Sequence, residues 1–226
     1  KTDGAVVTEP TEMNICLAHK GFVWLQVEIV GRAAHGSRFD QGIDANMRMG
    51  RFIAELDKLE QELRQRRGHP LTGTPSLHAA IISGGTALTA YAARCRLQIE
   101  RRTISGESDA QVVSEIQDIL NRLASEDATF QGTVKSLLSR QPSEITSETE
   151  LVRILSQASM GVLGHHPKYI GVAYWMDTAL LSAAGIETVT IGPIGAGAHA
   201  EIEWVEIQSL IDLAEILIAT SVDYCQ

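Results

Sequence analysis

Two hydrophobic patterns alternate along the central part of the chain, about residues 19–138. Residues 22–30 place apolar side chains at every second position, which predicts a β-strand, whereas from Ile43 they recur at intervals of three and four, which predicts a long amphipathic helix. A second helix is expected behind a capping box formed by Ser108 and Gln111. Further strands are expected at 77–83, 94–102 and near 129–138. This order of elements predicts a ferredoxin-like α+β domain.

Shorter elements flank this central domain. Ser147 and Glu150 form a second capping box that predicts a helix. The expected elements that follow are a strand at 169–174, a helix at 177–184, a strand at 186–191, a glycine-rich loop at 192–200 and a final helix. Alternating strands and helices predict an α/β domain with a mostly parallel sheet. We therefore expect residues 1–18 and 142–226 to share one α/β domain, into which a domain of residues 19–141 is inserted.

Composition narrows the possible partners. The chain has 226 residues, 44% of them hydrophobic, so it can bury a core, and its net charge of −9 argues against nucleic acid as a partner. It has no apolar run of the ~20 residues that span a bilayer, so no membrane association is expected. Cys16, Cys95 and Cys225 form no close pair, which fits a reducing, cytoplasmic location.

Two residues of the outer segments are candidate metal ligands. Glu9 follows a short apolar strand, and the carboxyl ends of parallel strands are where α/β sheets place functional groups. His199 lies in the loop of residues 192–200, whose glycines allow close backbone approach. From position alone, Glu9 can equally be a solvated turn residue, and His199 a histidine without a ligand.

Three further residues have both a functional and an ordinary interpretation. His35 follows a predicted strand and could polarise a carbonyl group, or be a simple loop histidine. Arg102 lies on the polar face of its strand and could clamp a carboxylate, or be a surface charge. Asp177 could contact a substrate, or act only as a helix N-cap. The residues alone predict a soluble α/β protein with possible metal ligands.

Six segments, taken in order, resemble one known family. They read VVTEPT, HKGFVWLQVEIVGRAAHGS, GIDAN, ISGGT, ERRTISGES and GPIGAGAHAEIEWVEI. In this order they resemble the metallopeptidase and deacylase family of acetylornithine deacetylase, succinyl-diaminopimelate desuccinylase, aminoacylase and a glutamate carboxypeptidase. The resemblance covers essentially the whole chain and implies a catalytic α/β domain interrupted by a ferredoxin-like lid that forms a homodimer.

The resemblance also implies roles for particular residues. Glu9 matches a carboxylate ligand of one metal ion, and His199 matches the histidine ligand of a second, with zinc expected and cobalt or manganese possible. His35 matches a lid histidine that stabilises the tetrahedral intermediate in the partner subunit's active site. Arg102 matches an arginine that holds the substrate carboxylate.

Other implied features concern the substrate pocket. Gly195 and Gly197 would form part of its wall, and Asp177 lies where a substrate contact is expected. Where family members often carry Asn and Pro after the GGT turn, this chain has Thr89 and Ala92, which removes one expected contact.

The implied function is metal-dependent cleavage of the amide bond in N-acyl amino acids or small peptides. In the family, several metal ligands and the general base lie before the VVTEPT segment, and this sequence does not contain them. We therefore expect these 226 residues to be the C-terminal portion of such an enzyme and to be inactive alone. The alternative is a catalytically incomplete dimerisation or binding module. An RNA-binding ferredoxin-like module is disfavoured by the acidic charge.

Overall fold

A computed structural model describes residues 2–226, and these residues form two compact units. The inserted unit comprises Gly21–His69 and Thr74–Gln141. The outer unit comprises the residues up to Lys20, the short segment Pro70–Gly73, and Pro142–Gln226. Within the described residues, no helix has the length and apolar character needed to cross a membrane.

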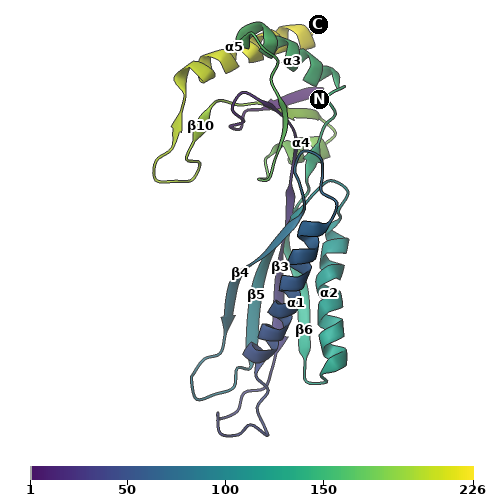
Figure 1. The fold of residues 1–226 in the computed structure, drawn as a ribbon, viewed down its shortest axis with the longest axis vertical. Helices are drawn as coiled ribbons and strands as arrows, with labels where there is room; N and C mark the ends of the chain where they lie inside the picture. The colour runs from purple at the N-terminus through teal and green to yellow at the C-terminus, as the bar shows by residue number, and fades with distance from the viewer. Residues whose placement is uncertain (1) are drawn as a thin grey trace. The chain divides into compact units, whose positions relative to one another are not determined.

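The inserted unit is a four-stranded antiparallel sheet with two helices. Its strands follow the order β4-β5-β3-β6 and comprise β3 (Gly21–Val30), β4 (Ser76–Gly84), β5 (Arg94–Thr103) and β6 (Gln131–Arg140). Helices α1 (Ala45–Gln65) and α2 (Asp109–Glu126) lie along one face of this sheet (Figure 1). The element order and strand order are those of the predicted ferredoxin-like arrangement.

Alternation in the sequence explains this packing. Val23, Leu25, Val27 and Ile29 of β3 have no exposed surface, and they pack in one core with the apolar faces of α1 and α2. Each such side chain contributes about 1.5–3 kcal/mol on burial. At the start of α2, the Ser108 hydroxyl accepts a hydrogen bond from the Gln111 backbone N–H, so this predicted cap is confirmed.

The sheet of the outer unit is mixed: its two longer pairings are parallel, as expected, and its two shorter ones are antiparallel. Its strands are β1 (Gly4–Val7), β2 (Ile15–His19), β7 (Ser143–Glu144), β8 (Tyr169–Val172) and β9 (Glu187–Thr190). Strands β1 and β9 pair in parallel, as do β2 and β8, but β2 runs antiparallel to both β7 and β9. A turn with positive φ at Glu12 and Met13 reverses the chain between β1 and β2. No periodicity in the sequence signals that reversal.

Helices lie on both faces of the mixed sheet. Helices α3 (Glu150–Leu163) and α5 (Ile207–Tyr224) pack together over the face that carries Val189 and Ile191 (Figure 1). The short helix α4 (Thr178–Ala183) meets the opposite face, where the hydroxyls of Thr178 and Thr190 lie 2.7 Å apart. The alternation of β9 therefore sends apolar side chains to one layer and hydroxyls to the other.

The predicted capping box at Ser147 was wrong. Helix α3 begins at Glu150 with Thr149 at the N-cap position, and no side chain caps it. The Ser147 hydroxyl donates instead to the carboxylate of Glu148, and a turn around Thr146 uses the nearby backbone groups. The serine therefore lies before the N-cap residue Thr149 rather than at the N-cap position.

Candidate functional site

The first candidate ligand, Glu9, lies at the edge where two parallel strands end. Strands β1 and β9 are in register up to Val7 and Thr190, so the residues that follow both strands emerge at the same edge of the sheet. Gly192 donates its N–H to the Thr11 hydroxyl at 2.9 Å, and its carbonyl accepts from Met13 N at 2.9 Å. These bonds fix the backbone that follows Glu9, whose own side chain is exposed.

The second candidate ligand, His199, lies in a β-hairpin that continues from the same edge. Strands β10 (Gly195–Ala196) and β11 (Trp204–Val205) form this antiparallel pair, and β10 lies within the segment 192–200 that was predicted to be loop. A Cβ atom on Gly195 would lie 2.6 Å from the Trp204 carbonyl oxygen, and Gly197 has φ +85°. Both glycines are therefore required by the hairpin itself, whatever they contact in a substrate pocket.

His199 has an unusual backbone conformation. Its φ is +63°, in the left-handed region that non-glycine residues seldom adopt, and its side chain is exposed. Such conformations persist where the surrounding structure enforces them and are frequent at functional sites. The hairpin thus presents the imidazole to solvent at a cost in backbone energy.

Asp177 occupies the residue before α4, but its side chain forms no capping bond. Its backbone carbonyl accepts from Leu180 N at 2.9 Å, and the carboxylate is exposed. The carboxylate therefore makes no contact that would account for it as an N-cap.

Together these residues do not complete a metal site. In the described range 2–226, no group of three or more His, Cys, Asp or Glu side chains is placed to hold a metal ion. Carboxylate and imidazole are donors that zinc accepts, but a stable zinc site needs at least three protein ligands. Glu9 and His199 can each supply one.

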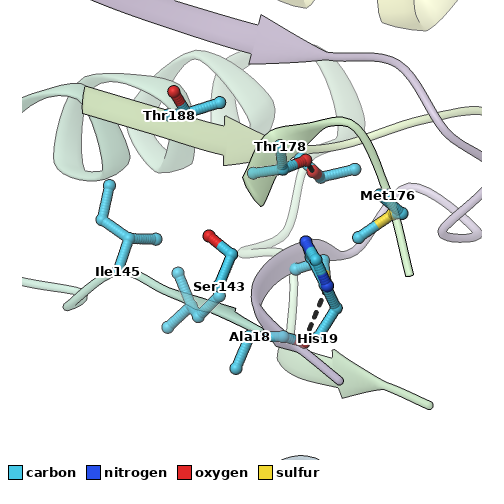
Figure 2. A pocket seen from close by; sticks show the side chains of 10 residues that line it. Ala18, His19, Ser143, Ile145, Met176, Thr178 and Thr188 are labelled. Atoms are coloured by element: carbon cyan, nitrogen blue, oxygen red, sulfur yellow. Dashed lines mark hydrogen bonds between the residues drawn. The ribbon is translucent and has the colours of Figure 1, made fainter. Parts of the chain in front are cut away.

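A histidine that sequence reasoning missed is buried in the outer unit. His19 is 2% exposed, and its Nδ1 lies 3.0 Å from the Lys20 carbonyl oxygen, so Nδ1 carries the proton. Nε2 is buried and has no hydrogen-bond partner within the described part of the chain. Figure 2 shows the ring in a narrow gap with Thr178 and Met176, which leaves no room for a water molecule.

Burial lowers the pKa of His19, although the bond to the Lys20 carbonyl opposes this shift. The imidazole is therefore neutral near pH 7 and closed to solvent, which fits a structural role rather than a catalytic one. The only sequence signal was its position at the end of a fully buried strand, which hydrophobic patterning does not detect because histidine is polar.

In the inserted unit, His35 is exposed and held in a defined tautomer. It bridges to Ala90 through the backbone, and its Nδ1 accepts from the Ser37 backbone N–H at 3.3 Å. The Ser37 hydroxyl lies 2.9 Å from the same nitrogen. Because Nδ1 is an acceptor, the neutral ring carries its proton on Nε2, which is then the hydrogen-bond donor.

Arg102 is engaged within its own sheet face. Its Nε donates to Glu100 at 2.7 Å, and its guanidinium carbon lies 5.5 Å from the centre of the Phe22 ring. The other oxygen of Glu100 accepts from Trp24 at 2.8 Å. A substrate carboxylate would therefore have to compete with Glu100 or use the terminal nitrogens of the guanidinium.

The inserted unit matches a known protein family. Residues 17–128 match the family model of the M20 peptidase dimerisation domain. The chain belongs to the M20 family of peptidases and deacylases. The M20 match spans the whole first β-α-β unit of the inserted sheet and ends just after α2.

Curated relatives extend the match beyond that domain. This M20 chain is 26% identical over 98% of its length to the acetylornithine deacetylase of Myxococcus xanthus, and 24% identical over its full length to that of Proteus mirabilis. In both comparisons it covers 57% of the relative. The chain thus spans a little over half the length of these relatives.

Solved structures share the fold. The aminopeptidase PepT of Bacillus cereus matches 96% of this M20 chain with a TM-score of 0.78 and 17% identity, over 56% of its own length. The dipeptidase Dug1p of Saccharomyces cerevisiae matches 96% with a TM-score of 0.70 and 13% identity, over 58% of its own length.

Proposed function

We propose that this chain is the larger part of a two-metal amidohydrolase that cleaves the amide bond of N-acyl amino acids or small peptides. Its substrate class follows from the two curated relatives, both acetylornithine deacetylases, and from the peptidases that share its fold. The protein would act as a homodimer through the inserted unit, which matches a peptidase dimerisation domain. A cytoplasmic location agrees with its widely spaced cysteines.

One observation carries this proposal most strongly. Glu9 and the hairpin of His199 both follow strands that end at the same edge of the outer sheet, and both side chains are exposed there. Two side chains of metal-binding type therefore emerge at the edge where open α/β sheets bind ligands. The left-handed backbone of His199, a conformation frequent at functional sites, adds to this support.

The remaining ligands and the general base would come from residues of the protein outside these 226. A pair of divalent ions, when bound, lowers the pKa of a shared water so that hydroxide exists near neutral pH. The outer unit would contribute Glu9 to one ion and His199 to the other. Asp177, Gly195 and Gly197 would border the substrate.

The inserted unit would contribute hydrogen-bond donors to the substrate. His35 holds its proton on Nε2, so it can donate to the oxyanion that develops when the carbonyl is attacked. Loss of one such donor costs about 10²–10³ in turnover. Arg102 would hold the substrate carboxylate through the nitrogens that Glu100 leaves unused.

The test uses the full-length protein from its natural source, with N-acetyl and N-succinyl amino acids and a dipeptide as substrates. A chelator should abolish turnover, and added zinc should restore it. His199→Ala should lose bound metal as well as turnover, whereas His166→Ala, a change at an exposed histidine of another loop, should lose neither. Unchanged metal content and turnover in His199→Ala would refute the assignment.

A second candidate is a non-catalytic dimerisation or binding module. The observation in its favour is that the described residues 2–226 contain no three-ligand group for a metal. In that case the intact protein would form dimers but would bind no metal and turn over none of the three substrates.

A further inference from the structure

A pocket of about 390 Å³ opens on the inserted unit beside the His35 segment. The residues around it come from the segment after β3, the end of β4 with its following turn, and the start of β5. They are Ala33, Ser83, Gly84, Gly85, Thr86, Ala90, Tyr91, Ala93, Arg94 and Arg96. Its volume is within the range of small-molecule sites.

Two arginines give this pocket its charge. Arg94 and Arg96 stand on the sheet face away from the helices, opposite Val30 and Glu28 of β3 in the strand register. Glu28 accepts from Arg94 Nη1 at 2.9 Å and from Arg96 Nε at 2.6 Å. Lys135 is close enough to help these arginines lower the pKa of Glu28. Three positive charges thus surround one carboxylate, on a chain whose net charge is −9.

Most of the hydrogen-bonding capacity of the two arginines remains unused. A guanidinium has five N–H donors, and each of these side chains uses one of them within the described part of the molecule. Their side chains are 62% and 53% exposed, so the remaining donors are accessible from the pocket. The way they hold Glu28 shows that the pair can accommodate a carboxylate.

Close packing holds the turn after β4 that forms one wall of the pocket. A Cβ atom on Gly84 would lie 2.8 Å from Cys95 Sγ, and Gly85 has φ +79°, so both positions depend on glycine. The same turn packs against the Asn46 side chain at the start of α1. This close packing fixes the wall that carries Ser83 and Thr86, whose hydroxyls can supply further hydrogen bonds.

We propose that this pocket binds the carboxylate group of a small organic acid through Arg94 and Arg96. Arginine pairs bind planar carboxylates with charge-assisted, often bidentate, hydrogen bonds. Ala90, which lines the pocket, bridges to His35, so the bound group would lie near that histidine. The carboxylate could belong to a substrate or to a free acid, and both present the same chemistry to the arginines.

Binding is measured by calorimetric titration of the full-length protein with glutarate at low salt, and with glutaramide as the uncharged control. The native chain should bind glutarate saturably and glutaramide not at all. The double variant Arg94→Gln/Arg96→Gln should bind at least about tenfold more weakly, a change of ~1.4 kcal/mol. Arg64→Gln, which removes an exposed arginine of α1 paired with Glu60, should leave binding unchanged.

A second variant tests the pocket without removing either arginine. Glu28→Gln frees both guanidinium groups from their internal partner, so it should tighten glutarate binding severalfold. The proposal is overturned if native chain and Glu28→Gln both fail to bind glutarate, or if the double arginine variant binds it as well as the native chain does. Because the readout is binding, these results stand whether or not the amidohydrolase proposal is right.

Two further measurements on the intact protein distinguish the source of the carboxylate. A substrate source predicts that Arg96→Gln raises KM for an N-succinyl amino acid more than for its N-acetyl counterpart. A free-acid source predicts that KM is unchanged for both, and that glutarate protects the native protein, but not the double variant, against thermal unfolding.

Discussion

Helices α1 and α5 show how differently the two units bury their apolar residues. In α1 the core positions are almost fully covered, and they are Ala45, Met49, Phe52, Leu56, Leu59 and Leu63. In α5 only Leu213 and Ile216 are buried apolar residues, while Ile207, Leu210, Ile211, Ile218 and Val222 are 43–74% exposed. The inserted unit thus covers its long helix on its own sheet, whereas α5 is apolar on several sides.

This contrast indicates which unit buries its apolar residues without a further layer of protein. A helix that is apolar all round is stable when protein covers it on more than one side. Contiguous exposed apolar surface marks an interaction site. The inserted unit therefore has a complete core of its own, and the outer unit presents on α5 a surface suited to another protein layer.

The largest expected loss of stability comes from truncating a core side chain of the inserted unit. Phe52→Ala in α1 should lower the free energy of unfolding by about 3–5 kcal/mol, because it leaves a cavity under the sheet. Ile218→Ala in α5 should change it by no more than about 0.5 kcal/mol, because that side chain is 65% exposed. Urea denaturation measures both. Equal losses would mean that α5 is covered within this chain.

The next largest effect is a difference in how much two neighbouring arginines of β5 contribute to the free energy of unfolding. Arg101 has no exposed surface and bonds Glu107 at 2.5 Å, with Glu115 3.5 Å from its Nε. Arg101→Gln should cost about 3–5 kcal/mol, because it removes a buried positive charge from two largely buried carboxylates. Arg102→Gln, which breaks a partly exposed pair with Glu100, should cost about 1 kcal/mol or less. Similar losses in thermal unfolding would contradict this division of roles.

A smaller effect is the pH dependence that His19 gives to the free energy of unfolding of the outer unit. Burial lowers the pKa of His19, so the unfolded chain binds a proton at pH values where the folded chain does not. The free energy of unfolding should therefore fall as the pH drops below about 6.5, and this loss should continue down to the lowered pKa of the folded state. His19→Asn should reduce the slope, and His166→Asn, at an exposed site, should not. An unchanged slope in His19→Asn would show that His19 is not protected from protonation.

The smallest effect concerns the three thiols. Burial raises the pKa of Cys16 to about 11. It also raises the pKa of Cys95, whereas Cys225 is exposed. In the native chain, a thiolate-specific reagent should modify Cys225 quickly and the other two slowly. In denaturant all three should react at similar rates. Rapid labelling of Cys95 in the native chain would indicate that the inserted unit opens more readily than its core suggests.

Local sequence signals predicted the inserted unit well. The alternation of residues 22–30 and the Ser108 cap depend on contacts within one strand or one helical turn, so the sequence alone predicts them. The failures involve longer-range or competing contacts. The direction of β2 depends on a turn held by Gly192, and the Ser147 cap fails because the Ser147 hydroxyl bonds Glu148 and a turn around Thr146 precedes the helix.

The sequence predicted only part of the candidate site. Position at a strand end predicted Glu9 as a candidate, and the resemblance to a known family assigned it a role. Neither could show that Arg102 is held by Glu100 or that Arg94 and Arg96 share Glu28, because these pairs form across strands distant in sequence. The ligand roles of Glu9 and His199 remain predictions.

Native mass spectrometry of the protein from its natural source tests the central claim most directly. The claim is that this chain forms most of a dimeric two-metal amidohydrolase whose other ligands lie outside these 226 residues. The account predicts a subunit heavier than 24.5 kDa, a dimer, and two divalent metal ions per subunit, of which at least one is lost in His199→Ala. A metal-free species with a subunit mass of 24.5 kDa would contradict it and favour the binding module.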